Sequence, residues 1–121
     1  MIDCCQCKGI ESQFDYKGAK KEQNKYFQKG PRRTTLELIN RISNKNINGN
    51  TLLDIGGGVG IIQYELLKNG ISKAVSIDAS SGYHKIALET AEELNLTDSI
   101  TNIHGDFANE NINPDPVDIV T

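Results

Sequence analysis

Apolar residues recur along the chain in short runs and in helical spacing, and the two patterns alternate. The short apolar runs, which predict strands, lie at 51–55, 73–78, 99–104 and from Val117 to Thr121. The segments with helical spacing between them lie at about 59–68 and 82–94. Strands that alternate with helices over short connections are typical of parallel βαβ units. We therefore predict an α/β fold with a Rossmann-like, doubly wound, mostly parallel sheet, truncated after its fourth strand.

Two further helices are predicted before the first strand. At about 14–29 lysines recur every four residues on one face, and another face carries Ala19, Gln23, Tyr26 and Phe27. Gly30-Pro31 ends this helix, and a second helix follows that places Leu38, Ile39 and Ile42 inward. The predicted parts are a flexible cysteine-containing tail at 1–13, a helical segment at 14–48, and an incomplete Rossmann-like domain at 49–121.

A glycine-rich turn, in the sequence LLDIGGGVG at Leu52–Gly60, joins the first strand to the helix after it. Glycine permits positive φ and close approach of a ligand, and a helix N-terminus offers unpaired N–H groups. The dinucleotide pattern G-x-G-x-x-G fails here, because Ile61 stands where the third glycine belongs. A nicotinamide-dependent oxidoreductase is therefore the disfavoured alternative. The pattern that fits is D-x-G-x-G-x-G, from Asp54 to Gly60.

This pattern resembles the first motif of the class I S-adenosylmethionine-dependent methyltransferases. Asp78 ends the second strand, where the family has an acidic residue that binds the ribose hydroxyls. Gly105-Asp106-Phe107 resembles the third motif, whose aspartate accepts a hydrogen bond from the adenine amino group. The resemblance implies that S-adenosyl-L-methionine is the cofactor. It implies a binding site made of Asp54, Gly56, Gly57, Gly58, Gly60, Asp78, Ala79, Asp106 and Phe107.

Several of these residues have a structural interpretation as well. Asp54 is as suited to holding backbone N–H groups of the turn as to direct contact with the cofactor. Asp78 is also a candidate helix N-cap, and Asp106 a candidate for an Asx-turn. Phe107 fits a core position as well as an adenine wall. For Asp78 and Asp106 the binding role is the preferred interpretation.

The resemblance also bears on the reaction. The N-terminal sequence, with YFQKGPRRTT, is similar to a small subgroup described as resembling magnesium-protoporphyrin O-methyltransferases, so we expect a small-molecule methyl acceptor. No catalytic residue is identified, and methyl transfer from a sulfonium requires no catalytic triad. Because the chain ends inside the fourth strand, we expect a fragment with weak cofactor binding and little turnover. The alternative is a non-catalytic module that works through a partner covering that edge.

Composition narrows the class of protein. The 121 residues contain no long apolar run and no signal-like N-terminus, which predicts a cytoplasmic protein without a membrane segment. The net charge is −3, so the chain as a whole is not a basic nucleic-acid binder. The segment 17–33 carries a charge of about +6, which leaves about −9 elsewhere. Its lysine face is expected to be solvated, with an anionic substrate as the alternative.

Three cysteines, Cys4, Cys5 and Cys7, crowd the N-terminus, an odd number that argues against a disulfide framework. Cys4 and Cys7 match half of a zinc site, which needs two more ligands. The two histidines of the chain, His84 and His104, lie far away in the α/β segment. We therefore expect no metal site.

Overall fold

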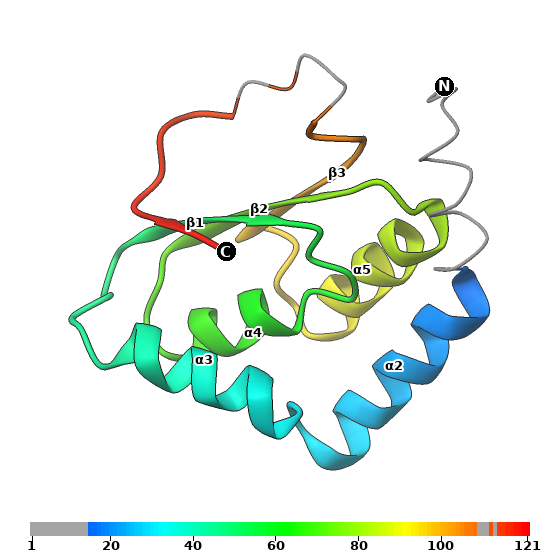
Figure 1. The fold of residues 1–121 in the computed structure, drawn as a ribbon, viewed down its shortest axis with the longest axis horizontal. Helices are drawn as coiled ribbons and strands as arrows, with labels where there is room; N and C mark the ends of the chain where they lie inside the picture. The colour runs from blue at the N-terminus through cyan, green and yellow to red at the C-terminus, as the bar shows by residue number, and fades with distance from the viewer. Residues whose placement is uncertain (1–14, 109–111, 113) are drawn as a thin grey trace.

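The protein was analysed as a computed structural model, which describes residues 15–108, 112 and 114–121. The predicted tail at 1–13, with its three cysteines, lies outside the described residues. Within the described ranges the chain forms one parallel sheet with helices packed against it (Figure 1). No helix in this part of the chain is both long enough and apolar enough to cross a membrane.

The described residues contain four strands, and their order in the sheet is β3-β2-β1-β4. The strands are β1 (Thr51–Ile55), β2 (Lys73–Asp78), β3 (Ile100–His104) and β4 (Ile119–Val120). All pairings are parallel, and Leu52 lies between Ala74 of β2 and Ile119 of β4. The strands β3 and β4 form the two edges of this sheet. The fourth strand begins two residues later than the predicted start at Val117.

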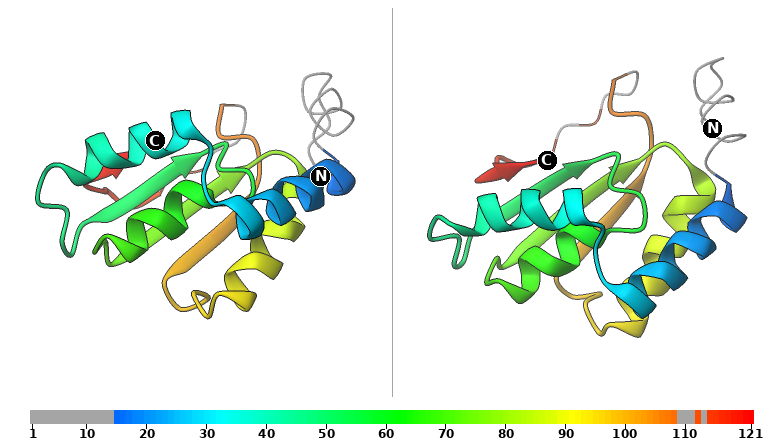
Figure 2. Two further views of the ribbon diagram at one scale, coloured as in Figure 1. Left: turned by 90° about the horizontal axis from the view of Figure 1, so that it is seen from below. Right: turned by 60° about the horizontal axis from the view of Figure 1, so that its bottom comes forward.

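Four helices are present in the described part of the chain: α2 (Tyr16–Lys29), α3 (Arg33–Ser43), α4 (Ile61–Lys68) and α5 (Ser81–Glu93). The two predicted N-terminal helices are confirmed as α2 and α3. Figure 2 shows that all four helices lie on one face of the sheet. In this layer α2 packs against α5, and α3 packs against α4.

The core lies between this helical layer and the sheet. Its strand residues, Leu52, Ala74 and Ile100, form one row across β1, β2 and β3. The helices add to the same cluster the buried residues Ala19, Tyr26, Ile39, Tyr64, Leu66, Ile86 and Ala91. The opposite row across the sheet, with Leu53 and Val75, has no helix over it among the described residues (Figure 2).

The predicted inward position of Leu38 is wrong. Leu38 is 42% exposed, because α3 packs along a narrow stripe that contains Ile39 and Ile42 and leaves its flanks in solvent. The helical spacing indicated the buried side of α3 correctly but overestimated its width. On α2 the face opposite the lysines buries Ala19, Gln23 and Tyr26, whereas Phe27 is 44% exposed.

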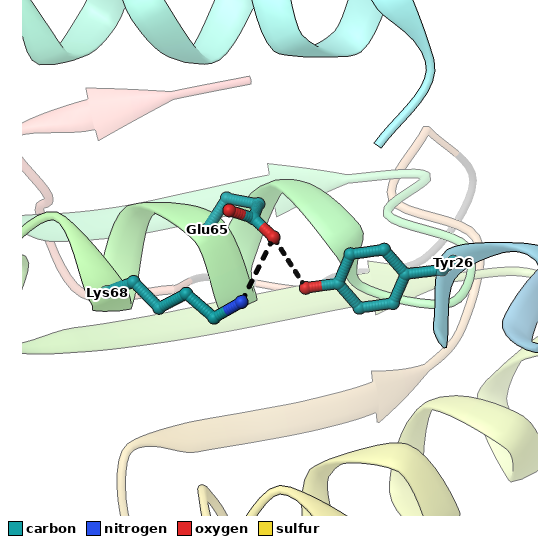
Figure 3. Close-up of polar contacts among 3 residues, drawn as sticks. All are labelled: Tyr26, Glu65 and Lys68. Carbon is teal, nitrogen blue, oxygen red and sulfur yellow. Dashed lines mark hydrogen bonds and ion pairs between the residues drawn. The ribbon is translucent and has the colours of Figure 1, made fainter. Parts of the chain in front are cut away.

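The helix α2 is fixed to the rest of the fold by buried polar contacts. Figure 3 shows that the hydroxyl of Tyr26 donates to Glu65 of α4 at 2.7 Å, and that the Lys68 ammonium lies 3.3 Å from the same oxygen. The Tyr26 ring stacks on Tyr64 with 6.0 Å between the ring centroids. Burial, with Glu65 adding to it, raises the pKa of Tyr26 well above its usual range.

A second set of contacts joins α2 to α5. Gln23 Nε2 donates to Thr90 Oγ1 at 2.8 Å, and this hydroxyl donates to the carbonyl of Ile86 at 2.6 Å. At the start of α5 the backbones themselves meet, since a Cβ added at Gly82 would collide with the backbone nitrogen of Tyr16. The position of α2 is therefore set at three points along its length.

We predict that Tyr26→Phe lowers the free energy of unfolding by about 1–2 kcal/mol, because it leaves a part-buried carboxylate without its neutral donor. Tyr16→Phe is the matched control, since this exposed tyrosine donates to Glu89 at 3.5 Å, and we expect a change below about 0.5 kcal/mol. Urea unfolding of both variants measures the two values. Equal losses in the two variants would show that α2 is not anchored through Glu65.

Candidate functional site

The glycine turn between β1 and α4 lies at the carboxyl end of the sheet. Gly56, Gly58 and Gly60 have φ values of 69°, 59° and 101°, in the left-handed region that other residues rarely adopt. Gly60 also serves as the N-cap of α4, and a Cβ there would lie 2.6 Å from the Tyr64 hydroxyl oxygen. The turn therefore requires glycine for its backbone conformation and for its packing.

Asp78 connects this turn to the loop after β2. Its Oδ2 accepts a hydrogen bond from the Gly58 N–H, and its Oδ1 accepts one from the Ser80 N–H, both at 2.8 Å. A carboxylate offers about four lone-pair positions, so two remain for a ligand. The helix N-cap role considered for Asp78 belongs to Ser80, whose hydroxyl accepts from the Tyr83 N–H at 3.2 Å.

Asp54 lies beneath the turn and is buried, with 3% of its surface exposed. Its carboxylate accepts hydrogen bonds from Gln63 Nε2 at 3.3 Å and from Thr121 Oγ1 at 3.1 Å. Burial raises the pKa of Asp54, with a smaller contribution from Asp78 in the same direction, while the two hydrogen bonds oppose the increase. Both of these donors are side chains, so Asp54 holds Gln63 and Thr121 rather than, as the structural interpretation predicted, backbone N–H groups of the turn.

The turn has no space for a side chain at Gly57. A Cβ there would lie 2.7 Å from Ser76 Oγ, 2.8 Å from Asp54 Oδ2 and 2.9 Å from Gln63 Nε2. The other amide atom of Gln63, Oε1, is buried and has no hydrogen-bond partner among the described residues. Gly57 thus closes the turn over a compact group of polar side chains.

Two adjoining hollows lie around the turn. The larger has a volume of about 370 Å³ and is lined by Glu22, Gly56, Gly57, Gly58, Asp78, Ala79 and Tyr83. The smaller has a volume of about 210 Å³ and is lined by Ile55, Gly56, Ile77, Ala79, Gly105, Asp106, Phe107 and Ala108. Gly56 and Ala79 belong to both. The structure thus brings together all the predicted site residues except Asp54 and Gly60, which support the turn from behind.

Asp106 and Phe107 line the smaller hollow after β3. Asp106 is 8% exposed, and its Oδ1 accepts from the Ala108 N–H at 3.0 Å, as the Asx-turn interpretation requires. Because Asp106 also lines the hollow, the turn and a ligand contact are compatible. Phe107 is 38% exposed and therefore is not a core residue of the described structure.

Sequence reasoning missed two residues of the larger hollow, Glu22 and Tyr83. The Tyr83 hydroxyl donates to Glu22 Oε2 at 2.8 Å, and burial together with Glu22 raises the pKa of Tyr83 to about 12. The Tyr83 ring also borders the turn, since a Cβ added at Gly58 would lie 3.4 Å from it. Glu22 stands out in the sequence as the only acidic residue in the basic segment 17–33. No sequence pattern, however, indicates that α2 lies beside the glycine turn.

The two histidines, His84 and His104, lie next to the loop that follows β2. Their rings stack at 5.5 Å between centroids, and His104 Nε2 lies 3.0 Å from the Ala79 carbonyl oxygen. Burial and the neighbouring His104 lower the pKa of His84. Within the described residues, no three His, Cys, Asp or Glu side chains are grouped so as to hold a metal ion.

The fold places this site where α/β sheets generally bind ligands. The connections from β1 to β2 and from β2 to β3 run toward one edge, and β4 then returns to the other side of β1. The strand order thus reverses next to β1, and ligands of open α/β sheets bind at the carboxyl ends of the strands near such a reversal. Both hollows include residues that follow the carboxyl ends of β1 and β2; the larger adds Glu22 of α2, and the smaller adds Gly105–Ala108, which follow β3.

Solved structures share this arrangement. One of them is an inferred S-adenosyl-L-methionine-dependent methyltransferase of Methanococcus maripaludis, which is 29% identical in sequence and matches with a TM-score of 0.69. The match covers 88% of this chain and 49% of the methyltransferase chain. The chain has the fold of the class I S-adenosylmethionine-dependent methyltransferases. It spans about half the length of that protein. No protein-family model matches the sequence, and no curated protein does.

Two other structures of this fold family illustrate its range. A methyltransferase of Thiobacillus denitrificans, solved with S-adenosyl-L-homocysteine, is 24% identical, with a TM-score of 0.61 over 74% of this chain and 35% of its own. Protein arginine methyltransferase 10 of Arabidopsis thaliana is 26% identical, with a TM-score of 0.55 over 61% of this chain and 21% of its own. The predicted α/β fold class is therefore confirmed.

We predict that Gly57→Ala lowers the free energy of unfolding by more than about 2 kcal/mol, because its methyl group must displace a buried polar group. Gly49→Ala is the control, since Gly49 has a φ of 79° but open space around it. There we expect a loss of about 1 kcal/mol from backbone strain alone. Urea unfolding tests both, and a smaller loss at Gly57 than at Gly49 would contradict the packing described.

The pH dependence of stability tests the burial of Asp54. Because its pKa is raised above 3.8 in the folded protein, the folded state binds this proton more tightly than the unfolded chain does. The stabilisation is fully present below pH 3.8 and is lost as the pH rises through the raised pKa. Wild type should thus lose stability relative to Asp54→Asn over that window, in urea unfolding at successive pH values. A gain in the stability of wild type relative to Asp54→Asn as the pH rises would contradict the raised pKa.

Proposed function

We propose that the two hollows together bind S-adenosyl-L-methionine, and that the chain is the cofactor-binding part of a methyltransferase. The observation that carries the proposal is Asp78, whose carboxylate joins both loops and keeps two acceptor positions free at the larger hollow. A cis-diol such as that of ribose offers two hydroxyl donors to such a carboxylate. The likeness in fold to methyltransferases supports the same cofactor.

The residues that line the hollows fit the parts of this cofactor. In the proposed arrangement Asp78 accepts from the ribose hydroxyls, and Asp106 accepts from the adenine amino group. Ile55, Ile77 and Phe107 provide an apolar wall for the adenine ring, since all three line the smaller hollow. Gly56–Gly58 form a wall without side chains, along which the methionine part is able to approach the backbone.

When bound, the cofactor supplies a methyl group that is already activated by its attachment to a positively charged sulfur. The task of the protein is then to hold the reacting atoms in line and to exclude water, and such positioning contributes on the order of 7–11 kcal/mol. A general base is required only where the acceptor must lose a proton. Among the described residues we assign none to that role.

For the acceptor we propose a small molecule. The fold does not decide this, because solved relatives include a protein arginine methyltransferase and an inferred sarcosine dimethylglycine methyltransferase of Galdieria sulphuraria. The support comes from the N-terminal sequence, which resembles the magnesium-protoporphyrin O-methyltransferase-like subgroup.

Asp78→Asn tests the cofactor site. We expect S-adenosyl-L-methionine to bind at least tenfold more weakly, because the amide replaces a charge-assisted acceptor by a neutral group of the same shape. Isothermal titration calorimetry measures the dissociation constant in wild type and variant. Asp98→Asn, at an exposed position outside both hollows, is the matched control and should leave binding unchanged.

Two results would contradict the proposal. One is the absence of binding to folded wild-type protein at millimolar ligand. The other is an equal loss of affinity in Asp78→Asn and Asp98→Asn. Because Asp78 also holds two backbone N–H groups, thermal unfolding of each variant must accompany the titration.

A further inference from the structure

The charges around the larger hollow are of one sign. Its charged lining residues in the described part of the chain are Glu22 and Asp78, both carboxylates. No lysine or arginine is among these lining residues. Arg32, whose positive charge reaches Tyr83, lies outside the lining. A ligand in this hollow therefore meets negative charge on two sides, from the loop after β2 and from α2.

Glu22 is an exception on its own helix. Every other charged residue of α2 is a lysine, and most of these are exposed. The face that carries Lys17, Lys21 and Lys25 is opposite the face that packs on the core. Glu22 lies on the side of the helix toward the turn, and its carboxylate accepts one hydrogen bond from the Tyr83 hydroxyl. That neutral donor orients the carboxylate but leaves its charge in place.

The fold keeps Glu22 in this position. The next residue, Gln23, donates to Thr90 of α5, and Tyr26, one turn further on, donates to Glu65 of α4. At the other end of the helix the Tyr16 backbone is in close contact with Gly82. Contacts on both sides of Glu22 thus prevent the helix from turning the carboxylate away from the hollow.

We propose that Glu22 is a specificity-determining residue that makes the hollow favour the methyl donor over the demethylated product. This inference rests on the proposed function. S-adenosyl-L-methionine carries a sulfonium, an ammonium and a carboxylate, a net charge of +1, whereas S-adenosyl-L-homocysteine has a neutral thioether and no net charge. The two ligands have nearly the same shape, so the negative charge of Glu22 discriminates between them through the difference in their net charge.

The size of the effect follows from Coulomb's law. Two unit charges about 7 Å apart interact by about 0.6 kcal/mol in water and about 2.4 kcal/mol at an effective dielectric constant of about 20. Since 1.4 kcal/mol corresponds to tenfold in affinity, Glu22 should change the relative affinity for the two ligands by about threefold in the first case and about fiftyfold in the second. The hydrogen bond from Tyr83 is not needed for this effect, because it does not alter the charge.

The test compares the two ligands by calorimetry with Glu22→Gln, which keeps the shape and the acceptor for Tyr83 but removes the charge. We expect the ratio of the dissociation constants, S-adenosyl-L-homocysteine over S-adenosyl-L-methionine, to fall by about three- to fiftyfold. Tyr83→Phe keeps the charge and removes the hydrogen bond, so its ratio should stay close to that of wild type. Glu37→Gln, at an exposed residue of α3 paired with Arg33, is the surface control.

The wild-type protein provides an independent measurement. Salt screens the attraction between Glu22 and the positively charged ligand. In wild type the ratio of the two dissociation constants should therefore decrease as the ionic strength is raised. An unchanged ratio in Glu22→Gln, a salt-insensitive ratio in wild type, or an equal fall of the ratio in Tyr83→Phe overturns the inference while leaving the proposed function intact. If wild type binds neither ligand, the proposed function itself fails, and this inference fails with it.

Discussion

The carboxylate of Asp78 is the interaction on which the site depends. It accepts from the Gly58 N–H in the turn after β1 and from the Ser80 N–H in the loop after β2. Two loops that belong to neighbouring parallel strands are thereby held as one surface. The conformation of the turn is set separately, by positive φ at three glycines and by the buried polar group under Gly57. Asp78 determines where that turn lies relative to the rest of the hollow.

The N-terminal helix α2 is part of this arrangement, although it precedes the sheet in the sequence. Its inner face contributes to the core through Ala19 and Tyr26, and its side toward the turn contributes Glu22 to the larger hollow. The hollow is therefore closed by a segment that a parallel sheet with its own crossover helices does not require. This explains how a short α/β domain acquires a charged wall opposite its glycine turn.

Much of the fold could be predicted from the sequence, because its local signals agree with its tertiary structure. The strands at 51–55 and 73–78 are short apolar runs ended by a glycine turn and by Asp78, and both were predicted with the observed bounds. The glycine turn, together with Asp78, Ala79, Asp106 and Phe107 of the two hollows, was predicted from the motif at Asp54–Gly60 and the family resemblance that it carries. The binding roles of these residues stay predictions.

What the sequence did not reveal depends on packing between distant segments. Glu22 and Tyr83 meet across 61 positions of the chain, and neither lies in a motif. The width of the buried stripe on α3 depends on how closely α4 approaches it, which helical spacing does not encode, so Leu38 was misplaced. Asp54 was predicted near a ligand, whereas the geometry that buries it beneath the turn involves Gln63 and Thr121.

The row of apolar side chains on the side of the sheet away from the helices has a consequence for energetics. Ile55 and Ile77 belong to that side and also form a wall of the hollow that contains Asp106. Ile77 is only 1% exposed, whereas Ile55 is 38% exposed, so a ligand in this hollow removes apolar surface from water chiefly at Ile55. Hydrophobic burial on this side of the sheet therefore contributes to binding in the smaller hollow, in addition to any contact with the Asp106 carboxylate.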